Sequence, residues 1–249
     1  MKIKELISKR ETKVLLSLLL FDVIMVVLHL LFGNKIFGNK TIFFNLDWEG
    51  NLPTMYQSFK IVFSGAILFC IWLIYKFVIK VKNKKILSFW FGTSILLITM
   101  GFDEGAELHE SIPQYFRDLL PRFSKWYEEI FRSIDFESSR WIIYVLIVFL
   151  PPVTAWLIYV FPTILKRYKK RLLPLIWGVI IFFTGAFVLE FVGTIDDVWR
   201  SHWYETIMFA EEFLEMVGGS LFVYFGLKEL FFLLDNLEVK ARNRVKGEV

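Results

Sequence analysis

The sequence predicts an all-α protein that forms one polytopic membrane helix bundle, and two observations lead to this class. The 249 residues are 56% hydrophobic and 18% aromatic, with a mean hydropathy of +0.53, well above the range of soluble domains. Apolar stretches of about twenty residues recur along the chain, and a helix of that length crosses a hydrocarbon core of roughly 30 Å. No repeat or linker divides the sequence, so residues 1–249 are expected to form a single integral-membrane domain.

About six transmembrane helices are expected. They cover residues 14–33, 59–80, 86–108, 141–165, 172–195 and 206–228. The first follows a basic segment and lacks a small-residue cleavage signature, so we expect a retained anchor helix and no signal peptide. Pro151 and Pro152 fall inside the fourth span and are expected to kink it, because neither has a backbone donor.

Lysine and arginine are distributed unequally between the two sets of connecting segments. Eighteen lie in 1–13, 80–85, 166–171 and 236–249, against eight in 34–58, 111–140 and 196–205. Because basic residues in short loops resist export, this pattern predicts a multi-pass protein of the plasma (inner) membrane with both termini in the cytoplasm. The net charge of +4 then belongs to the cytoplasmic face, and nucleic acid is not expected as a partner.

The longest connecting segment, 111–140, mixes aromatic and aliphatic residues with charges at roughly helical spacing. This pattern predicts one or two helices lying in the outer membrane interface. Such helices would act either as a lid or only as a connector.

Ionisable residues gather at the outer end of the third span, in the run GFDEGAELHE. They are Asp103, Glu104, Glu107, His109 and Glu110. At 100° per residue, Asp103, Glu107 and Glu110 share one helix face, with Thr99 one turn deeper. Glu104 lies beside this face and His109 points away from it.

Further acidic residues and a histidine lie in other spans. They are Asp22 and His29 in the first span, Glu190 in the fifth, and Glu211, Glu212 and Glu215 in the sixth, and all except Asp22 fall in the outer half. An ionised carboxylate in hydrocarbon costs about 2.5–3.5 kcal/mol even on the lenient insertion scale, so these groups need partners. Ion pairing is a weak explanation, because the outer halves of spans one, three, five and six contain no lysine or arginine.

Protonation or a bound metal ion would also neutralise the acids. Oxygen ligands with one or two histidines suit a divalent ion such as Fe, Mn, Ca or Mg, and the lone Cys70 excludes a thiolate site. The predicted ligands are Asp103, Glu107, Glu190, Glu211, Glu212 and Glu215, with His109 and His29 as nitrogen ligands or proton carriers. Candidate catalytic residues are Glu104, His109 and Glu110.

Each of these features also has a structural interpretation. The 103–110 segment would be a solvated helix end, and His29 and His202 would be satisfied interface histidines. Asp22 would either bond a neighbouring serine or backbone group, or continue a proton pathway toward the cytoplasm.

Three motifs resemble a widespread set of uncharacterised bacterial multi-pass membrane proteins. They are Leu46-Asp47-x-Glu49-x-Asn51-x-Pro53-Thr54, Asp103-Glu104-x4-His109-Glu110 and Glu211-Glu212-x2-Glu215-x2-Gly218. The resemblance spans most of the chain and implies that the three segments form one site, without naming a reaction. Gly101 stands where this pattern has a serine, which removes a hydroxyl from the expected site.

The sequence therefore leaves three functions open. The first is a metal-dependent enzyme, in which a divalent ion and a carboxylate base act on a lipid or lipid-linked substrate. The second is a transporter or channel whose acids bind a cation or relay protons. The third is a structural or receptor subunit of the membrane.

Overall fold

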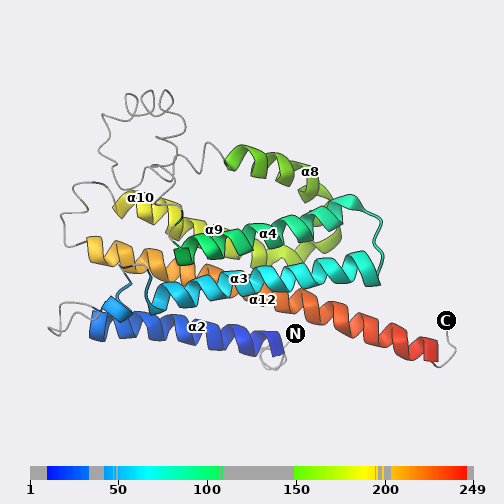
Figure 1. The fold of residues 1–249 in the computed structure, drawn as a ribbon, viewed down its shortest axis with the longest axis horizontal. Helices are drawn as coiled ribbons and strands as arrows, with labels where there is room; N and C mark the ends of the chain where they lie inside the picture. The colour runs from blue at the N-terminus through cyan, green and yellow to red at the C-terminus, as the bar shows by residue number, and fades with distance from the viewer. Residues whose placement is uncertain are drawn as a thin grey trace.

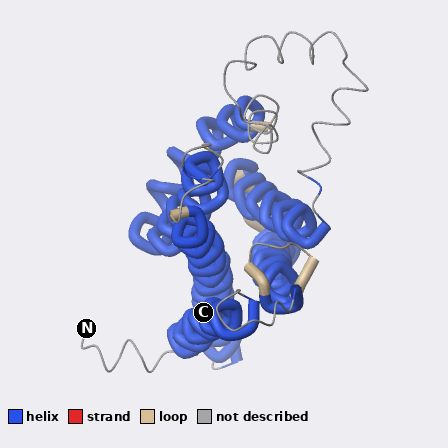
Figure 2. The backbone as a smooth tube through the Cα atoms, turned by 90° about the vertical axis from the view of Figure 1, so that its left-hand side faces the viewer, coloured by secondary structure: helices blue, strands red, loops and turns tan. Residues whose placement is uncertain are grey.

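The computed structural model describes residues 10–33, 42–46, 48, 50–106, 108, 149–193, 195, 198 and 203–245, and every regular element among them is helical. The helices lie roughly along one direction in an elongated bundle (Figure 1), and Figure 2 views them nearly end on. Five segments are long and apolar enough to cross a membrane: Arg10–Gly33, Leu52–Val78, Lys84–Ala106, Leu150–Gly193 and Tyr204–Val239. The predicted all-α class and multi-pass membrane character are confirmed.

The first half of the bundle consists of three long helices. They are α2 (Arg10–Leu28), which continues as the π-helical turn η1 (His29–Gly33), α3 (Leu52–Leu73), which continues as the π-helical turn η4 (Ile74–Val78), and α4 (Lys84–Ala106). A short 3-10 turn, η3 (Ile42–Phe44), lies between α2 and α3. The second span thus begins seven residues before the sequence-predicted start at 59.

The second half contains a reversal of the chain. Its elements are α8 (Leu150–Tyr168), η5 (Lys169–Leu172), α9 (Leu173–Phe183), the π-helical η6 (Thr184–Leu189), α10 (Glu190–Gly193) and α12 (Tyr204–Val245). Lys169 has a φ of 44°, which breaks the helix, and α8 and α9 run in opposite directions in Figure 1. The long apolar segment from 150 to 193 is therefore two helices joined by η5.

The prediction that Pro151 and Pro152 kink the interior of a helix is wrong. Helix α8 begins at Leu150, so both prolines occupy its first turn. The backbone N–H groups of a first turn have no intrahelical partner, and proline costs little there.

We name each end of the bundle after one residue, because different elements lie there. The Asn51 end holds the starts of α3 and α12, and the Arg171 end holds η5, the start of α2 and the connection between η4 and α4 (Figure 1). Helix α12 extends past the other helices at the Arg171 end.

Helices α3 and α4 pack closely through two matched serine–glycine contacts. Ser58 Oγ donates to the Gly101 carbonyl at 2.6 Å, and Ser94 Oγ donates to the Gly65 carbonyl at 2.9 Å. A Cβ on Gly101 would lie 2.8 Å from the amide nitrogen of Val62, and one on Gly65 would lie 2.9 Å from a backbone atom of α4. Glycine at 101 therefore permits the close approach of the two backbones, and the hydroxyl comes from the facing helix.

Helices α9 and α12 use a similar reciprocal arrangement. A Cβ on Gly178 would lie 2.8 Å from the Phe222 ring, and one on Gly218 would lie 2.9 Å from backbone atoms of Phe182. Gly218 closes the third sequence motif, so at least this motif residue serves helix packing.

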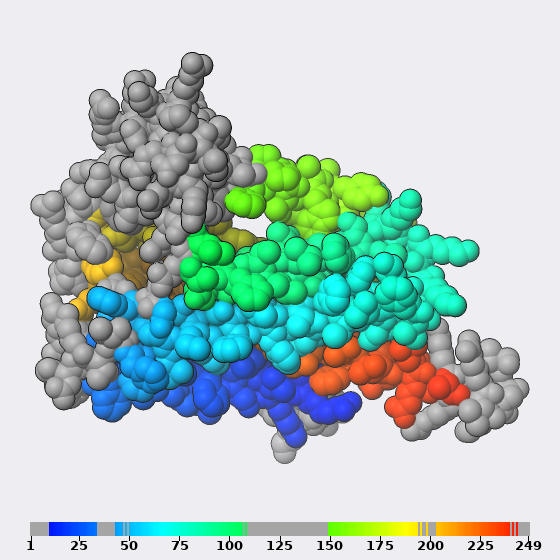
Figure 3. Space-filling view, in the orientation of Figure 1, coloured from blue at the N-terminus to red at the C-terminus, as the bar shows by residue number. Residues whose placement is uncertain are grey.

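An aromatic core fills the bundle toward the Arg171 end. The Trp90 ring stacks on Phe225 at 5.8 Å and on Tyr75 at 5.9 Å, and its Nε1 donates to the Tyr168 hydroxyl at 3.1 Å. Helix α8 contacts α4 through Trp156, which covers Gly92, and it diverges from α4 toward Leu150 (Figure 3). Large apolar side chains on the outside, such as Phe59 and Ile158, fit contact with lipid.

Candidate functional site

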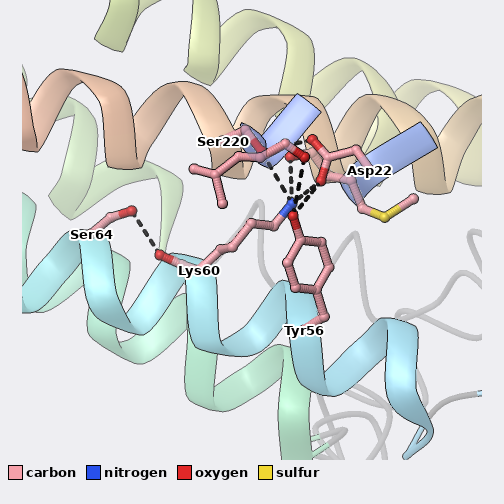
Figure 4. Close-up of polar contacts among 7 residues, drawn as sticks. Asp22, Tyr56, Lys60, Ser64 and Ser220 are labelled. Carbon is pink, nitrogen blue, oxygen red and sulfur yellow. Dashed lines mark hydrogen bonds and ion pairs between the residues drawn. The ribbon is translucent and has the colours of Figure 1, made fainter. Parts of the chain in front are cut away.

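Four polar side chains meet halfway along α2 and form the Lys60 network (Figure 4). Its members are Asp22 of α2, Tyr56 and Lys60 of α3, and Ser220 of α12, together with the Met216 carbonyl. Tyr56 and Lys60 are four residues apart, as are Met216 and Ser220, so each pair lies on one helix face. The Lys60 side chain is 4% exposed and that of Asp22 is 0% exposed.

The Lys60 ammonium uses all of its donors within the network. Its Nζ lies 2.7 Å from Asp22 Oδ1 and 2.8 Å from the Met216 carbonyl oxygen. The third acceptor is Ser220 Oγ at 3.3 Å. The ammonium also lies 4.3 Å from the centroid of the Tyr56 ring, within the range of a cation–π contact.

The Asp22 carboxylate is equally well bonded. Besides Lys60, its Oδ1 accepts a hydrogen bond from the Tyr56 hydroxyl at 2.9 Å, and its Oδ2 accepts one from Ser220 Oγ at 2.7 Å. A buried ion pair is tolerated only when its geometry is good and its remaining donors and acceptors are satisfied. The Lys60 network meets both conditions.

The network corrects one step of the sequence interpretation. Ion pairing was judged weak because four of the spans lack a base in their outer halves, but Lys60 comes from the second span. The alternative in which Asp22 bonds a serine is confirmed by its contact with Ser220. Sequence reasoning missed Lys60 and Tyr56, because the predicted start at 59 put Lys60 at the edge of the span. A lysine well inside an apolar helix would have indicated a buried partner.

A second group of ionisable side chains lies nearer the Asn51 end, around Glu215. This Glu215 group consists of Glu215, Glu211 and Glu212 of α12, Glu104 of α4 and Glu190 of α10, because the last four interact electrostatically with Glu215. Glu215 itself is 8% exposed. Four predicted ligands, Glu190, Glu211, Glu212 and Glu215, therefore interact electrostatically within one group, which also includes the predicted catalytic residue Glu104.

The π-helical segment η6 helps to bring α10 against α12. A Cβ on Gly185 would lie 2.7 Å from the Glu211 carbonyl oxygen and 2.9 Å from Glu215 Cγ. Glycine therefore allows η6 to approach the acidic turn of α12. Segments of π-helix are frequent at functional sites, where they alter the direction of side chains.

Gln57 lies one turn from Lys60 toward the Asn51 end, between the two groups. Its side chain is 2% exposed, and neither Nε2 nor Oε1 has a hydrogen-bond partner. The amide packs against Gly219, where an added Cβ would lie 3.0 Å from Oε1. Along α12, Gly219 lies one turn after Glu215 and directly before Ser220, which bonds Lys60. The Gln57 amide therefore lies between the Glu215 group and the Lys60 network. Lys60 also interacts electrostatically with Glu104.

His29 has a well-defined role within the described residues. Its ring is 2% exposed, its Nδ1 accepts a hydrogen bond from the Leu46 amide at 2.8 Å, and it meets the Phe209 ring edge-on at 4.9 Å. A Cβ on Gly33 would lie 2.9 Å from the same nitrogen. The Leu46 amide therefore occupies Nδ1, one of the two ring nitrogens of the predicted ligand His29.

Asp103 and Glu104 are neighbours on α4 but lie on different faces of the helix. Glu104 interacts with Glu215 and Lys60, as described above. Asp103 is half-buried, and Thr99, which was expected on its face, is exposed and donates to carbonyl groups of its own helix. The face of α4 that turns toward α12 is thus the one with Glu104.

Several predicted residues lie outside the described part of the chain. They are Glu107, His109 and Glu110 of the third span, Asp47 and Glu49 of the first motif, His202, and the interfacial segment 111–140. Among the described residues, no group of three His, Cys, Asp or Glu side chains is spaced to hold a metal ion.

The first motif has a local structural role. Asn51 caps α3: its Oδ1 accepts from the Thr54 amide and hydroxyl, both at 3.2 Å, and its Nδ2 donates to the Asn45 and Trp48 carbonyls. Pro53 lies in the first turn of the helix. The Asn51-x-Pro53-Thr54 part therefore fixes where α3 begins.

Comparison with known families gives one match. The family described as Domain of unknown function (DUF8692) matches residues 17–228, which include both the Lys60 network and the Glu215 group. No curated protein and no solved structure matches the chain.

Proposed function

The chain belongs to the family of the domain of unknown function DUF8692, and we propose that it is an integral membrane protein that binds a divalent cation at the Glu215 group. The observation that carries the proposal is the burial of Glu215 among four other carboxylates from three helical elements. Packing several carboxylates in a membrane bundle is costly unless a positive charge or protons compensate them. Among the described residues, the lysine that interacts with this group, Lys60, is already bonded to Asp22.

The donor chemistry of the group fits a hard cation, because carboxylate oxygens are the ligands that Ca, Mg, Mn and Fe prefer. Glu211, Glu212 and Glu215 come from adjacent turns of one helix and would have to converge on the ion. Asp103, Glu107, Glu190, His109 and His29 remain the proposed additional ligands.

The proposed topology has six membrane crossings, with α8 and α9 counted separately, and both termini on the cytoplasmic side of the plasma membrane. The basic segments 80–85 and 166–171 support it, since they lie at the Arg171 end together with the start of α2 (Figure 1). This places the Glu215 group in the outer half of the membrane. A lipid or lipid-linked molecule entering from the outer leaflet is then the proposed substrate, with Glu104, His109 or Glu110 as the base.

Metal content tests the proposal. We would measure metals by elemental analysis in detergent-purified wild type and in Glu211/Glu212/Glu215→Gln, after mild chelator washing. A matched control, Asp235→Asn/Glu238→Gln, neutralises exposed acids near the other end of the same helix. We expect stoichiometric metal in the wild type and the control only. A wild type that stays metal-free during titration with Ca, Mg, Mn and Fe would overturn the proposal.

A second candidate function is coupled transport of protons or cations. It is favoured by the buried, unpartnered Gln57 amide between the two groups and by the interaction of Glu104 with Lys60. A water-bonded amide at this place would link the Glu215 group to Asp22 and so extend a polar path into the bundle.

Flux measurements separate the two functions. Proteoliposomes containing the wild type should show proton- or metal-dependent flux if the protein is a carrier, and Glu215→Gln and Gln57→Leu should abolish it. Ser64→Ala, which removes only a bond from Ser64 Oγ to the Lys60 carbonyl of its own helix, should leave flux unchanged. Metal binding without flux would leave the enzyme, or a structural metal, as the remaining functions.

A further inference from the structure

A pocket of about 390 Å³ opens at the Arg171 end, between the start of α2, η5 and α12. Among the described residues, three basic and three acidic side chains line it: Arg10, Arg171, Lys228, Glu11, Glu229 and Asp235. The charges of these described residues balance, and the lining is strongly polar. It is separate from the Glu215 group, which lies toward the opposite end of the bundle.

The innermost charged groups of this pocket are incompletely bonded. Glu229 is 0% exposed, and neither of its carboxylate oxygens has a hydrogen-bond partner. Arg171 approaches it with Nε at 3.5 Å from Oε1, while the buried Nη1 of Arg171 has no partner. A buried charge without hydrogen bonds is costly, so the pocket offers both an acceptor and a donor to a ligand.

Neighbouring rings hold the guanidinium in place. The Arg171 guanidinium carbon lies 4.1 Å from the centroid of the Phe232 ring and 5.0 Å from that of Tyr168. A guanidinium fixed on aromatic faces is well suited to phosphate, because less freedom is lost on binding. Farther out, Arg10 and Asp235 form an exposed ion pair at 3.9 Å.

The position of the pocket narrows the ligand class. It lies where α2 begins and where η5 joins α8 to α9, so it falls at the end of the membrane-crossing segments. Lipid headgroups occupy this level, and basic pockets between membrane helices bind headgroup phosphates. A purely anionic headgroup would meet three carboxylates here, whereas a headgroup with both charges would match both sets.

We propose that this pocket binds the headgroup of a phospholipid that carries a primary ammonium beside its phosphate. The ammonium donates hydrogen bonds to Glu229, and the phosphate accepts them from Arg171. The inference does not depend on the cation site proposed above.

The proposed headgroup site can be tested on the wild-type chain with a series of lipids that differ only in the number of N–H donors on the headgroup ammonium. Native mass spectrometry of the delipidated, detergent-solubilised protein would give apparent affinities for dioleoylphosphatidylethanolamine and for its monomethyl, dimethyl and trimethyl (choline) forms. We expect affinity to fall with each methyl group, by about tenfold over the series, since one charge-assisted hydrogen bond has about that value. Equal affinity along the series would overturn the proposal, as would tighter binding of dioleoylphosphatidylglycerol.

Two variants assign the contacts. Glu229→Gln should bind all four lipids with nearly equal affinity, and adding Arg171→Gln to it should weaken all four together. Glu238→Gln, the same change on an exposed residue of α12 outside the pocket, should keep the tenfold preference. Retention of the preference in Glu229→Gln would contradict the assigned role.

Soluble O-phosphoethanolamine separates a lipid from a soluble ligand of the same chemistry. It should displace the lipid only at concentrations far above the lipid's apparent Kd, because it lacks the acyl chains that contact the outer faces of α2 and α12. If it binds as tightly as the lipid, the occupant is a soluble compound and the lipid assignment is wrong.

Discussion

Asp22 and Glu229 are both fully buried carboxylates, and each faces one basic side chain, but their surroundings differ. Both oxygens of Asp22 accept hydrogen bonds, and its partner Lys60 uses every donor. Neither oxygen of Glu229 has such a bond, and its partner Arg171 also lines a pocket. We call Asp22–Lys60 the closed pair, because its hydrogen bonds are complete without a ligand. We call Glu229–Arg171 the open pair, because it has donors and acceptors left for a ligand.

The difference shows that burial alone does not identify a ligand site. The number of hydrogen bonds still missing is more informative, because native proteins satisfy nearly all of their buried polar atoms. By this measure Gln57 and Glu229 are candidates for ligand contact, and Asp22 is not.

The largest expected loss of stability follows removal of the basic side chain from the closed pair. Lys60→Met should lower the free energy of unfolding by about 3–5 kcal/mol, because it leaves the Asp22 carboxylate buried without compensation. Arg171→Met should cost clearly less, since Arg171 makes a single contact with Glu229, at 3.5 Å, and Glu229 has no hydrogen bond to lose. Denaturant unfolding in mild detergent would measure both.

The double variant Lys60→Met/Asp22→Leu serves as the control for this prediction. It removes both charges and should recover most of the lost stability, because an apolar pair of similar volume can replace a buried ion pair. A double variant as unstable as Lys60→Met would mean that the charge is not the cause.

A smaller effect is expected for the hydroxyl that joins the two charges. Ser220→Ala should cost about 1.5–3 kcal/mol, since it removes a donor to Asp22 and an acceptor for Lys60, both charged. Ser64→Ala should cost much less, because Ser64 Oγ bonds only a carbonyl of its own helix. Equal losses in the two variants would show that the network does not depend on Ser220.

Tyr56→Phe should cost about 1.5 kcal/mol, the lower end of the range for a single hydrogen bond to a charged group. The ring stays beside the Lys60 ammonium, and Asp22 keeps its bonds from Lys60 and Ser220. The same unfolding assay applies, and a loss as large as that of Lys60→Met would contradict this account of the network.

The smallest change is expected in the open pair. Glu229→Gln should alter the free energy of unfolding by less than about 1 kcal/mol, because the carboxylate has no hydrogen bond to lose. Asp22→Asn should cost several times more. If the two variants were equally unstable, the distinction between closed and open pairs would be wrong.

Much of the fold was predictable, because apolar length and composition specify membrane helices. The starts and ends of the helices were harder to predict. Asn51 caps α3 at Leu52, seven residues before the predicted start, and so places Lys60 more than two turns inside the helix. Viewed from a start at 59, the same lysine lies at the boundary and gives no reason to look for a buried partner.

The site was predictable in part. Helical spacing grouped Glu211, Glu212 and Glu215, because their place on one turn of α12 follows from local geometry alone. The contacts of Asp22 with Lys60 and of Gln57 with Gly219 join different helices. They depend on which helices are neighbours, and the packing of the first long helix, α2, against the last, α12, leaves no local signal in the sequence.

The bond between Asp22 and Ser220 joins residues 198 positions apart, and this has a consequence for biosynthesis. The ribosome makes α2 and α3 well before α12, so Lys60 in the nascent chain at first lacks two of its three acceptors. Chains that stop before α12 retain an incompletely bonded ion pair inside the membrane. Such a defect would mark unfinished chains for membrane proteases, whereas insertion of α12 completes the bonds and removes it.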